Sequence, residues 1–189
     1  MPTPQDATDA ELIRRIAAGE RVAMQALFGR HQARVYRFAL RLVGSQMTAE
    51  DIASDVFIDV WRQAGRFEHR ATVSTWLLSI ARNKAYDQMR KRRDEPLQDD
   101  VAAALEDPDD DPEIARQKQD KGALMRSCLA RLSPEHREVI DLVYYHEKSV
   151  AEVAEITGAP QATVKTRMFY ARKRLSELFA EAGVDRGWP

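Results

Sequence analysis

The feature that most constrains this chain is the separation of its charges along the sequence. Residues 94–113 hold ten carboxylates and three prolines, with no Lys or Arg and no sustained helical period. A basic segment lies on either side: residues 82–93 carry six cations against one acid, and residues 163–174 carry five cations and no acid. Because like charges repel, the acidic stretch is typical of a flexible, extended tether. The sequence therefore predicts a first domain (1–93), a flexible acidic linker (94–112) and a second domain (113–189).

Composition narrows the class of protein further. Of the 189 residues, 44% are hydrophobic, which is too many for a wholly disordered chain. The longest apolar run has five residues, Val101–Leu105, and residues 1–20 hold no hydrophobic signal-peptide core. We therefore expect a cytoplasmic protein that makes no membrane contact of its own. Cys128 is the only cysteine, which excludes an intrachain disulfide and a multi-cysteine metal site.

Glycines and capping residues divide the remaining sequence into helices. Thr8 with Glu11, Thr48 with Asp51, and Ser149 with Glu152 have capping-box spacing or a close variant of it, and Ser133-Pro134 is typical of a helix start. No alternating strand pattern of useful length is present. The fold class is therefore predicted to be all-α, with two small helical bundles. The expected helices cover residues 8–18, 21–43, 48–64, 74–92, 114–132, 134–145, 149–157 and 161–182.

The second domain contains the ingredients of a helix-turn-helix. A short capped helix, a turn at Gly158-Ala159-Pro160 and a second helix follow one another. Five apolar residues recur at three- and four-residue intervals along the second helix and are expected to face the core: Val164, Met168, Ala171, Leu175 and Leu178. The opposite, basic face suits insertion into the DNA major groove, although a solvated face is the alternative. Of the neighbours Phe169 and Tyr170, at least one is expected to pack inward.

The first domain has an acidic ridge on the helix expected at residues 48–64. Asp51, Asp55 and Asp59 are four residues apart and stack on one side, where like charges cost helix stability. This indicates a basic protein partner, with simple solvation as the alternative. An apolar stripe on the same helix, broadened by Phe57 and Trp61, is expected to face the core.

A polar loop at residues 66–74 leads into the cationic helix at residues 74–92. Trp76 stands at the start of this helix and is suited to stacking on unpaired bases, while the cations follow the nucleic-acid backbone. The alternative is that Trp76 is an ordinary core residue. Both domains therefore carry a candidate nucleic-acid surface.

At this point four segments, in this order and spacing, closely resemble bacterial sigma factors of the extracytoplasmic-function (ECF) group. They are AEDIASDVFIDVW, STWLLSIARNKAYDQMRKRR, LSPEHREVIDLVYYHEKSVAEVAEITG and ATVKTRMFYARKRL. The resemblance covers roughly residues 27–93 and 132–178. It implies that the first domain is sigma region two and the second is sigma region four, without a third domain between them.

The resemblance also implies roles for the candidate residues. Three residues would bind core RNA polymerase by docking on the clamp helices of its β′ subunit: Asp51, Asp55 and Phe57. The resemblance also implies contact with the β subunit of the polymerase. Those that capture and melt the −10 element would be Phe67, Trp76, Arg82, Asn83, Lys84 and Arg90, together with Lys91 to Arg93 on the promoter backbone. Those that contact the −35 element would be Lys165, Thr166, Arg167, Phe169, Tyr170, Arg172 and Lys173.

The family's recognition helix commonly opens with Gly, where this chain has Ala162. Since alanine is a poor N-cap, the helix is expected to begin one residue earlier or to be capped by Thr163. The resemblance further implies promoter DNA as a ligand, and an anti-sigma factor that holds the protein inactive until a stress signal.

Two other classes of function are the alternatives. An autonomous helix-turn-helix repressor or activator would bind duplex DNA without polymerase, usually as a symmetric dimer. An enzyme finds little support, because the sequence has no phosphate-binding glycine motif, and its four histidines form no HExxH or ExxH pattern. We therefore expect no catalysis, no cofactor and no metal.

Overall fold

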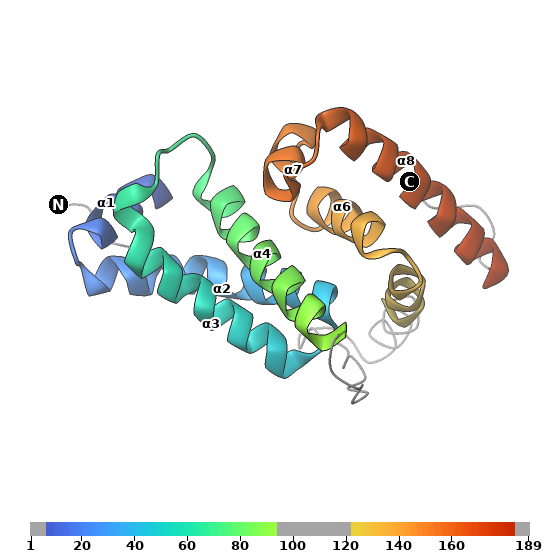
Figure 1. Ribbon diagram of the computed structural model, residues 1–189, viewed down its shortest axis with the longest axis horizontal. Helices are drawn as coiled ribbons and strands as arrows, with labels where there is room; N and C mark the ends of the chain where they lie inside the picture. Colours follow the sequence, from blue (N-terminus) through green and yellow to red (C-terminus); the bar gives the residue numbers. More distant parts are fainter. Residues whose placement is uncertain (1–6, 94–121, 184–189) are drawn as a thin grey trace, which may run out of the picture. The chain divides into compact units, whose positions relative to one another are not determined.

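The computed structural model describes residues 7–93 and 122–183, drawn in colour in Figure 1. The predicted acidic linker at 94–112 lies outside these residues. Helices and short turns make up both described stretches, and neither contains a strand, which confirms the all-α prediction. The chain divides into two compact units, one built on the N-terminal helices and the other on the C-terminal helices.

In the first unit, three long helices pack against one another, and a short N-terminal helix packs mainly on the first of them (Figure 1). These elements are α1 (Asp9–Ala17), α2 (Arg21–Val43), α3 (Gln46–Gln63), the 3-10 turn η1 (Ala64–Arg66) and α4 (Val73–Arg93). The core between them is apolar, with Leu27, Phe38, Val56 and Leu77 almost completely buried. The predicted bounds of α2 are confirmed at both ends, since Gly44 follows it in the left-handed conformation that favours glycine.

The start of α3 differs from the prediction. Ser45, not Thr48, is the N-cap, and its Oγ accepts a hydrogen bond from the Thr48 amide at 3.4 Å. Thr48 lies inside the first turn and donates its own hydroxyl to Ser45 Oγ at 3.1 Å. Ser45 directly follows Gly44, so the first residue able to cap the helix takes that position.

The second unit contains the helix-turn-helix. Its elements are α6 (Pro134–Tyr144), α7 (Val150–Thr157) and α8 (Gln161–Glu181), and residues 122–130 are also helical. The capping box at α7 is reciprocal: the Ser149 amide donates to Glu152 Oε2 at 3.0 Å, and the Glu152 amide donates to Ser149 Oγ at 3.3 Å. Gly158, with a φ of +67°, opens the three-residue turn to α8.

Helix α8 begins at Gln161, one residue before Ala162, so the first of the two predicted starts is correct. Pro160 occupies the N-cap position without a side-chain hydrogen bond, and Thr163 does not cap the helix. Helix α8 packs on α6, and all five apolar positions predicted to face the core are buried. The opposite side of α8 is therefore left for solvent or for a ligand.

Candidate nucleic-acid interface

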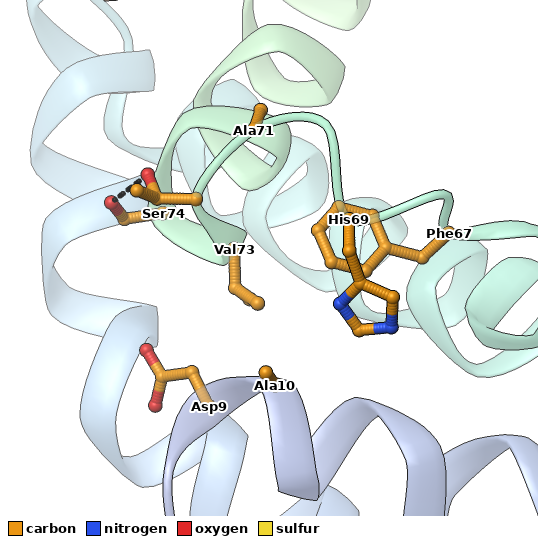
Figure 2. Close-up of a pocket in the computed structure, with 8 residues that line it drawn as sticks. Asp9, Ala10, Phe67, His69, Ala71, Val73 and Ser74 are labelled. Atoms are coloured by element: carbon orange, nitrogen blue, oxygen red, sulfur yellow. Dashed lines mark hydrogen bonds between the residues drawn. The ribbon is translucent and has the colours of Figure 1, made fainter.

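A pocket of about 360 Å³ lies where the loop before α4 meets α1. In Figure 2 the rings of Phe67 and His69 stand on one side, Val73 lies across from them, and Asp9 and Ala10 approach from α1. The volume is in the range of small-ligand pockets. His69 has a φ of +55°, a left-handed conformation that costs a residue with a side chain about 1–2 kcal/mol. Such local strain is concentrated at functional sites, so this loop is a good candidate for one.

Three aromatic rings are grouped beside this pocket. Phe67 lines it, and the Phe67 ring centroid lies 4.7 Å from those of both His69 and Trp76. The planes of Phe67 and Trp76 are tilted by only 30°, which is close to stacking. Trp76 was expected either to stack on unpaired bases or to be an ordinary core residue. It is half-buried: its ring packs against Phe67, and part of it is still exposed.

Thr72 organises the start of α4 at the same pocket. Its Oγ1 accepts a hydrogen bond from the Thr75 amide at 3.2 Å, as an N-cap does, and donates to the buried hydroxyl of Thr75 at 2.8 Å. Ser74 Oγ lies 3.2 Å from the same Thr72 oxygen, along the dashed line of Figure 2. The first turn of the cationic helix is therefore fixed to the pocket wall.

Sequence reasoning missed the α1 side of the pocket. Asp9 is held by two residues of α2: Arg30 donates to Asp9 Oδ1 at 2.9 Å, and His31 Nε2 lies 2.6 Å from Asp9 Oδ2. Arg30 also donates to the Ala7 carbonyl at 2.7 Å. Burial alone would raise the pKa of Asp9, but the hydrogen bonds and charges of Arg30 and His31 together outweigh it and lower that pKa. Asp9 lies 21 and 22 positions from Arg30 and His31, so no local sequence pattern indicates this cluster.

We expect Asp9→Asn to destabilise the first unit by about 1–2 kcal/mol at pH 7, because Arg30 and the buried His31 lose a charged acceptor. Because the pKa of Asp9 is lower in the folded state than in the unfolded state, its carboxylate stabilises the fold at pH values above the unfolded-state pKa. This contribution is lost as the pH falls through the folded-state pKa. The variant should therefore lose less stability than the parent between pH 5 and pH 3, as read by urea unfolding with tryptophan fluorescence.

Glu11→Gln is the matched control for this prediction. Glu11 lies on the same helix and pairs with Arg14 at 3.0 Å, but both side chains are exposed. Exposed pairs contribute little, so this variant should unfold nearly as the parent does. Equal pH profiles for the parent and Asp9→Asn would contradict the stabilising role of Asp9.

The cations predicted on α4 differ in how they are engaged. The Lys84 ammonium lies 2.7 Å from Asp59 and 4.0 Å from Asp55, so much of its charge is matched within the fold. The Arg82 guanidinium lies 4.4 Å from the centroid of the Tyr86 ring, in cation–π geometry. Asn83 is exposed beside them.

Farther along α4, Arg90 pairs with Asp87, and Arg92 donates to Thr48 Oγ1 at 2.6 Å. Both arginines and Lys91 remain exposed, so the end of α4 is a solvent-facing cationic surface. Such a surface is suited to the phosphate backbone of a nucleic acid.

The acidic ridge of α3 is shorter than the sequence indicated. Asp51 and Asp55 are exposed, whereas Asp59 is largely covered and neutralised by Lys84. Part of the repulsion taken as a sign of a basic partner is therefore relieved inside the molecule. The negative charge left for a partner is therefore that of Asp51, together with the part of the Asp55 charge that Lys84 does not compensate.

The two aromatic residues that broaden the predicted apolar stripe of α3 lie differently. Phe57, which the resemblance also implied at the polymerase surface, is only 4% exposed, as expected for the stripe, and packs edge-to-face on Phe28 of α2, with ring centroids 4.9 Å apart. Trp61, predicted in the core stripe, is 40% exposed. Phe28, which is 43% exposed, gives the first unit an outward aromatic ring that sequence reasoning missed.

The outer face of α8 forms a second cationic surface, confined to the second unit. A pocket of about 790 Å³ is lined by Lys148 and Ser149 at the start of α7 and by residues of α8. The α8 members are Lys165, Met168, Phe169, Arg172 and Lys173. The Arg172 guanidinium lies 5.6 Å from the centroid of Tyr144, which restrains it at the rim. Thr166 is exposed and Arg167 half-buried on the same helix.

The prediction that Phe169 or Tyr170 packs inward is wrong. Phe169 is 64% exposed and Tyr170 is 52% exposed. Their rings pack edge-to-face on each other, with centroids 5.4 Å apart. The core of α8 is already filled by the residues one position away, Met168 and Ala171, so both aromatic rings project outward.

The part of the chain that the structure describes lacks two other features. No group of three or more His, Cys, Asp or Glu residues there has a geometry able to hold a metal ion. No helix of residues 7–93 or 122–183 is long and apolar enough to cross a membrane.

Comparison with known proteins explains why two cationic helical units occur in one chain. The Sigma-70 region 2 family matches residues 27–95, and the Sigma-70 region 4 family matches residues 123–175. The ECF RNA polymerase sigma factor SigL of Mycobacterium tuberculosis is 33% identical over 171 residues, which cover 90% of this chain and 96% of SigL. The chain belongs to the ECF sigma factor family. SigM of the same species is also 33% identical, over 94% of this sigma factor and 89% of its own length.

Solved structures show the same fold. The sigma factor RpoE of Bartonella quintana, crystallised in complex with the anti-sigma factor NepR, aligns with a TM-score of 0.67 and 29% identity. The alignment covers 84% of this sigma factor and 96% of RpoE. CnrH, solved in complex with the cytosolic domain of CnrY, aligns with a TM-score of 0.68 over 92% of this chain and 97% of CnrH. At 24% identity this second likeness concerns the fold alone.

Proposed function

We propose that this sigma factor binds core RNA polymerase, directs it to promoters with a −10 and a −35 element, and promotes DNA melting at the first of these. One observation carries the proposal: one unit joins an aromatic pocket to a cationic helix, while the other presents a cationic recognition helix. Aromatic rings beside cations suit unpaired bases, and a basic helix after a tight turn suits duplex DNA.

In the first unit, the pocket bounded by Phe67 and backed by Trp76 receives an unpaired base of the −10 element. Arg82, Asn83 and Arg90 lie along α4, where the adjoining strand passes, and the exposed cations at residues 90–92 contact its phosphates. Lys84 has a smaller part than the sequence implied, because Asp59 and Asp55 engage its charge. Catching a flipped base removes it from the stack and favours the open duplex.

In the second unit, α8 enters the major groove of the −35 element. Lys165, Arg167, Arg172 and Lys173 supply positive charge along α8 for phosphates and base edges. Thr166, Phe169 and Tyr170 are the candidate base-reading side chains on this helix. Asp51 and Asp55 on α3 of the first unit dock on the β′ clamp helices. Phe28, which is backed by Phe57, offers a further exposed aromatic contact.

An anti-sigma factor holds this protein inactive until a signal releases it. The support is the family relationship and the Bartonella quintana relative, which was crystallised with an anti-sigma factor. The domain limits at residues 93 and 113, with an acidic tether between them, belong to the same proposal.

The proposed function is tested by transcription with purified components. This protein plus core RNA polymerase should initiate at a specific promoter, whereas neither component does so alone. Tight binding of the free protein to duplex DNA as a symmetric dimer, without any effect on where the polymerase initiates, would instead support an autonomous regulator.

For Arg172→Ala we expect a general loss of promoter affinity that does not depend on base sequence, with the slope of log affinity against log salt falling by about one. The measurement is a salt titration of the polymerase complex on −35 duplex DNA. Arg174→Ala is the control, because Arg174 lies on the same helix but pairs with Glu177 at 3.0 Å and Glu181 at 3.5 Å. An unchanged slope for Arg172→Ala would mean that Arg172 contacts no phosphate.

A further inference from the structure

Helix α2 carries a set of cations that the proposed function does not use. The helix has no lysine and no acidic residue, but it holds five arginines: Arg21, Arg30, Arg34, Arg37 and Arg41. The last four occupy positions i, i+4, i+7 and i+11, so they follow one line along the helix. We call these four residues the arginine line.

The fold does not account for the two central members of this line. Arg34 and Arg37 are exposed, and neither forms an ion pair or a hydrogen bond with another residue of the described ranges 7–93 and 122–183. The core side of α2 is formed by other residues, among them Val35 and Phe38, which are almost completely buried. Since like charges at this spacing reduce helix stability, the two arginines indicate an anionic ligand.

The arginine line begins beside the loop pocket. Its first member, Arg30, donates to Asp9 Oδ1 at 2.9 Å, and Asp9 lines the pocket from α1. Val73 and Ser74, in the first turn of α4, line the same pocket (Figure 2). One part of the pocket wall therefore belongs to α4, and another belongs to α1, which Asp9 ties to α2. A DNA strand with one base in this pocket has phosphates on both sides of that base, and the two sides can follow different helices.

We propose that the arginine line binds the phosphates of an unpaired DNA strand on the side of the captured base that leads away from α4. This inference rests on the proposed function, because it assumes that the pocket takes a base of the −10 element. On one side of this base the strand follows the cations of α4, and on the other side it follows α2. The distance from Arg34 to Arg41 along the helix axis is about 10 Å, which matches about three nucleotides at about 3.4 Å each.

The chemistry of the arginine line fits phosphates. A guanidinium group donates two parallel hydrogen bonds to the oxygens of a phosphate and does not lose its charge in proteins. Evenly spaced cations suit a ligand that repeats one negative charge, as a sugar-phosphate backbone does. An acidic protein segment is the alternative ligand, and the test below separates the two.

The test lengthens an unpaired strand on one side of the captured base at a time. The full chain in complex with core polymerase binds a forked promoter, and 2-aminopurine fluorescence first locates the captured base. Two series then add abasic nucleotides one by one, one series on each side of this base, so that only sugar and phosphate are added. Affinity is measured by competition at several salt concentrations. For the parent protein, we expect both series to gain affinity over the first two or three nucleotides.

Two variants should fail on opposite sides of the captured base. Arg34→Ala/Arg37→Ala should lose about tenfold in affinity at 0.15 M salt in one series only, with the slope of log affinity against log salt falling by about 1.4, the value for two phosphates of a single strand. Lys91→Ala, which removes an exposed cation of α4, should weaken the other series. Arg21→Ala is the control, because Arg21 is an exposed arginine of the same helix outside the line, and it should leave both series unchanged.

The fold of the double variant is checked by urea unfolding, which should match that of the parent because both arginines are exposed. If Arg34→Ala/Arg37→Ala leaves both series as in the parent, or weakens them equally, α2 does not hold one side of the strand, and the proposed function still stands. If the double variant binds DNA normally but loses affinity for an anti-sigma protein, the arginine line binds an acidic protein segment instead. If the parent complex opens no promoter, the proposed function fails together with this inference.

Discussion

Reversing two exposed charges on α3 is expected to reduce binding to core RNA polymerase about a hundredfold or more. In the Asp51→Lys/Asp55→Lys variant, two carboxylates are lost and two cations face a partner surface that we propose to be basic. Like charges brought together at an interface cost several kcal/mol, and each 1.4 kcal/mol is a factor of ten. Binding of fluorescently labelled protein to core polymerase at two salt concentrations measures both the loss and its electrostatic origin.

The choice of residues follows from the structure and not from the spacing of the acids. Asp59 is left unchanged, because its replacement would leave the half-buried Lys84 without its nearest counterion and destabilise the unit. Glu50→Lys, an exposed reversal on the same helix but off the ridge, is the control. If the double variant binds polymerase as tightly as the Glu50→Lys control, the polymerase contact lies elsewhere.

Helix bounds were predictable because they depend on neighbouring residues. Gly44 ends α2, Ser133-Pro134 opens α6, and the Ser149–Glu152 pair caps α7, each through contacts within a few positions. The inward face of α8 was predictable for a similar reason, since the helical period alone sets which residues share a side. Where two capping residues compete within three positions, as Ser45 and Thr48 do, the sequence does not decide between them.

The candidate site was less predictable, because its contacts join distant parts of the chain. Lys84 on α4 pairs with Asp59 on α3. Asp9 reaches the loop pocket only because α1 packs beside that pocket and Arg30 of α2 holds the Asp9 carboxylate. Average burial preferences also failed for Phe169 and Tyr170. These preferences describe how side chains stabilise a fold, and the two rings that we propose to contact DNA depart from them.

Replacing Trp76 by alanine is expected to lower the yield of open promoter complexes by about tenfold to a hundredfold while leaving polymerase binding unchanged. The indole backs Phe67 at 4.7 Å in near-stacked geometry, so its loss loosens the wall against which an unpaired base packs. Base–aromatic stacking contributes about 1–3 kcal/mol, which sets the size of the effect. Fluorescence of 2-aminopurine placed in the −10 element, together with resistance of the complex to heparin, measures opening.

Two comparisons separate this role from simple damage to the fold. Trp76→Phe keeps an aromatic face against Phe67 and should recover most of the open complexes, whereas Trp76→Leu, which is apolar but cannot stack, should not. A promoter whose −10 region is already unpaired should reduce the defect of Trp76→Ala, because duplex unpairing no longer opposes base capture. A Trp76→Ala protein with normal open-complex yield on duplex DNA would remove this residue from the melting step, and the pocket beside Phe67 would then need another explanation.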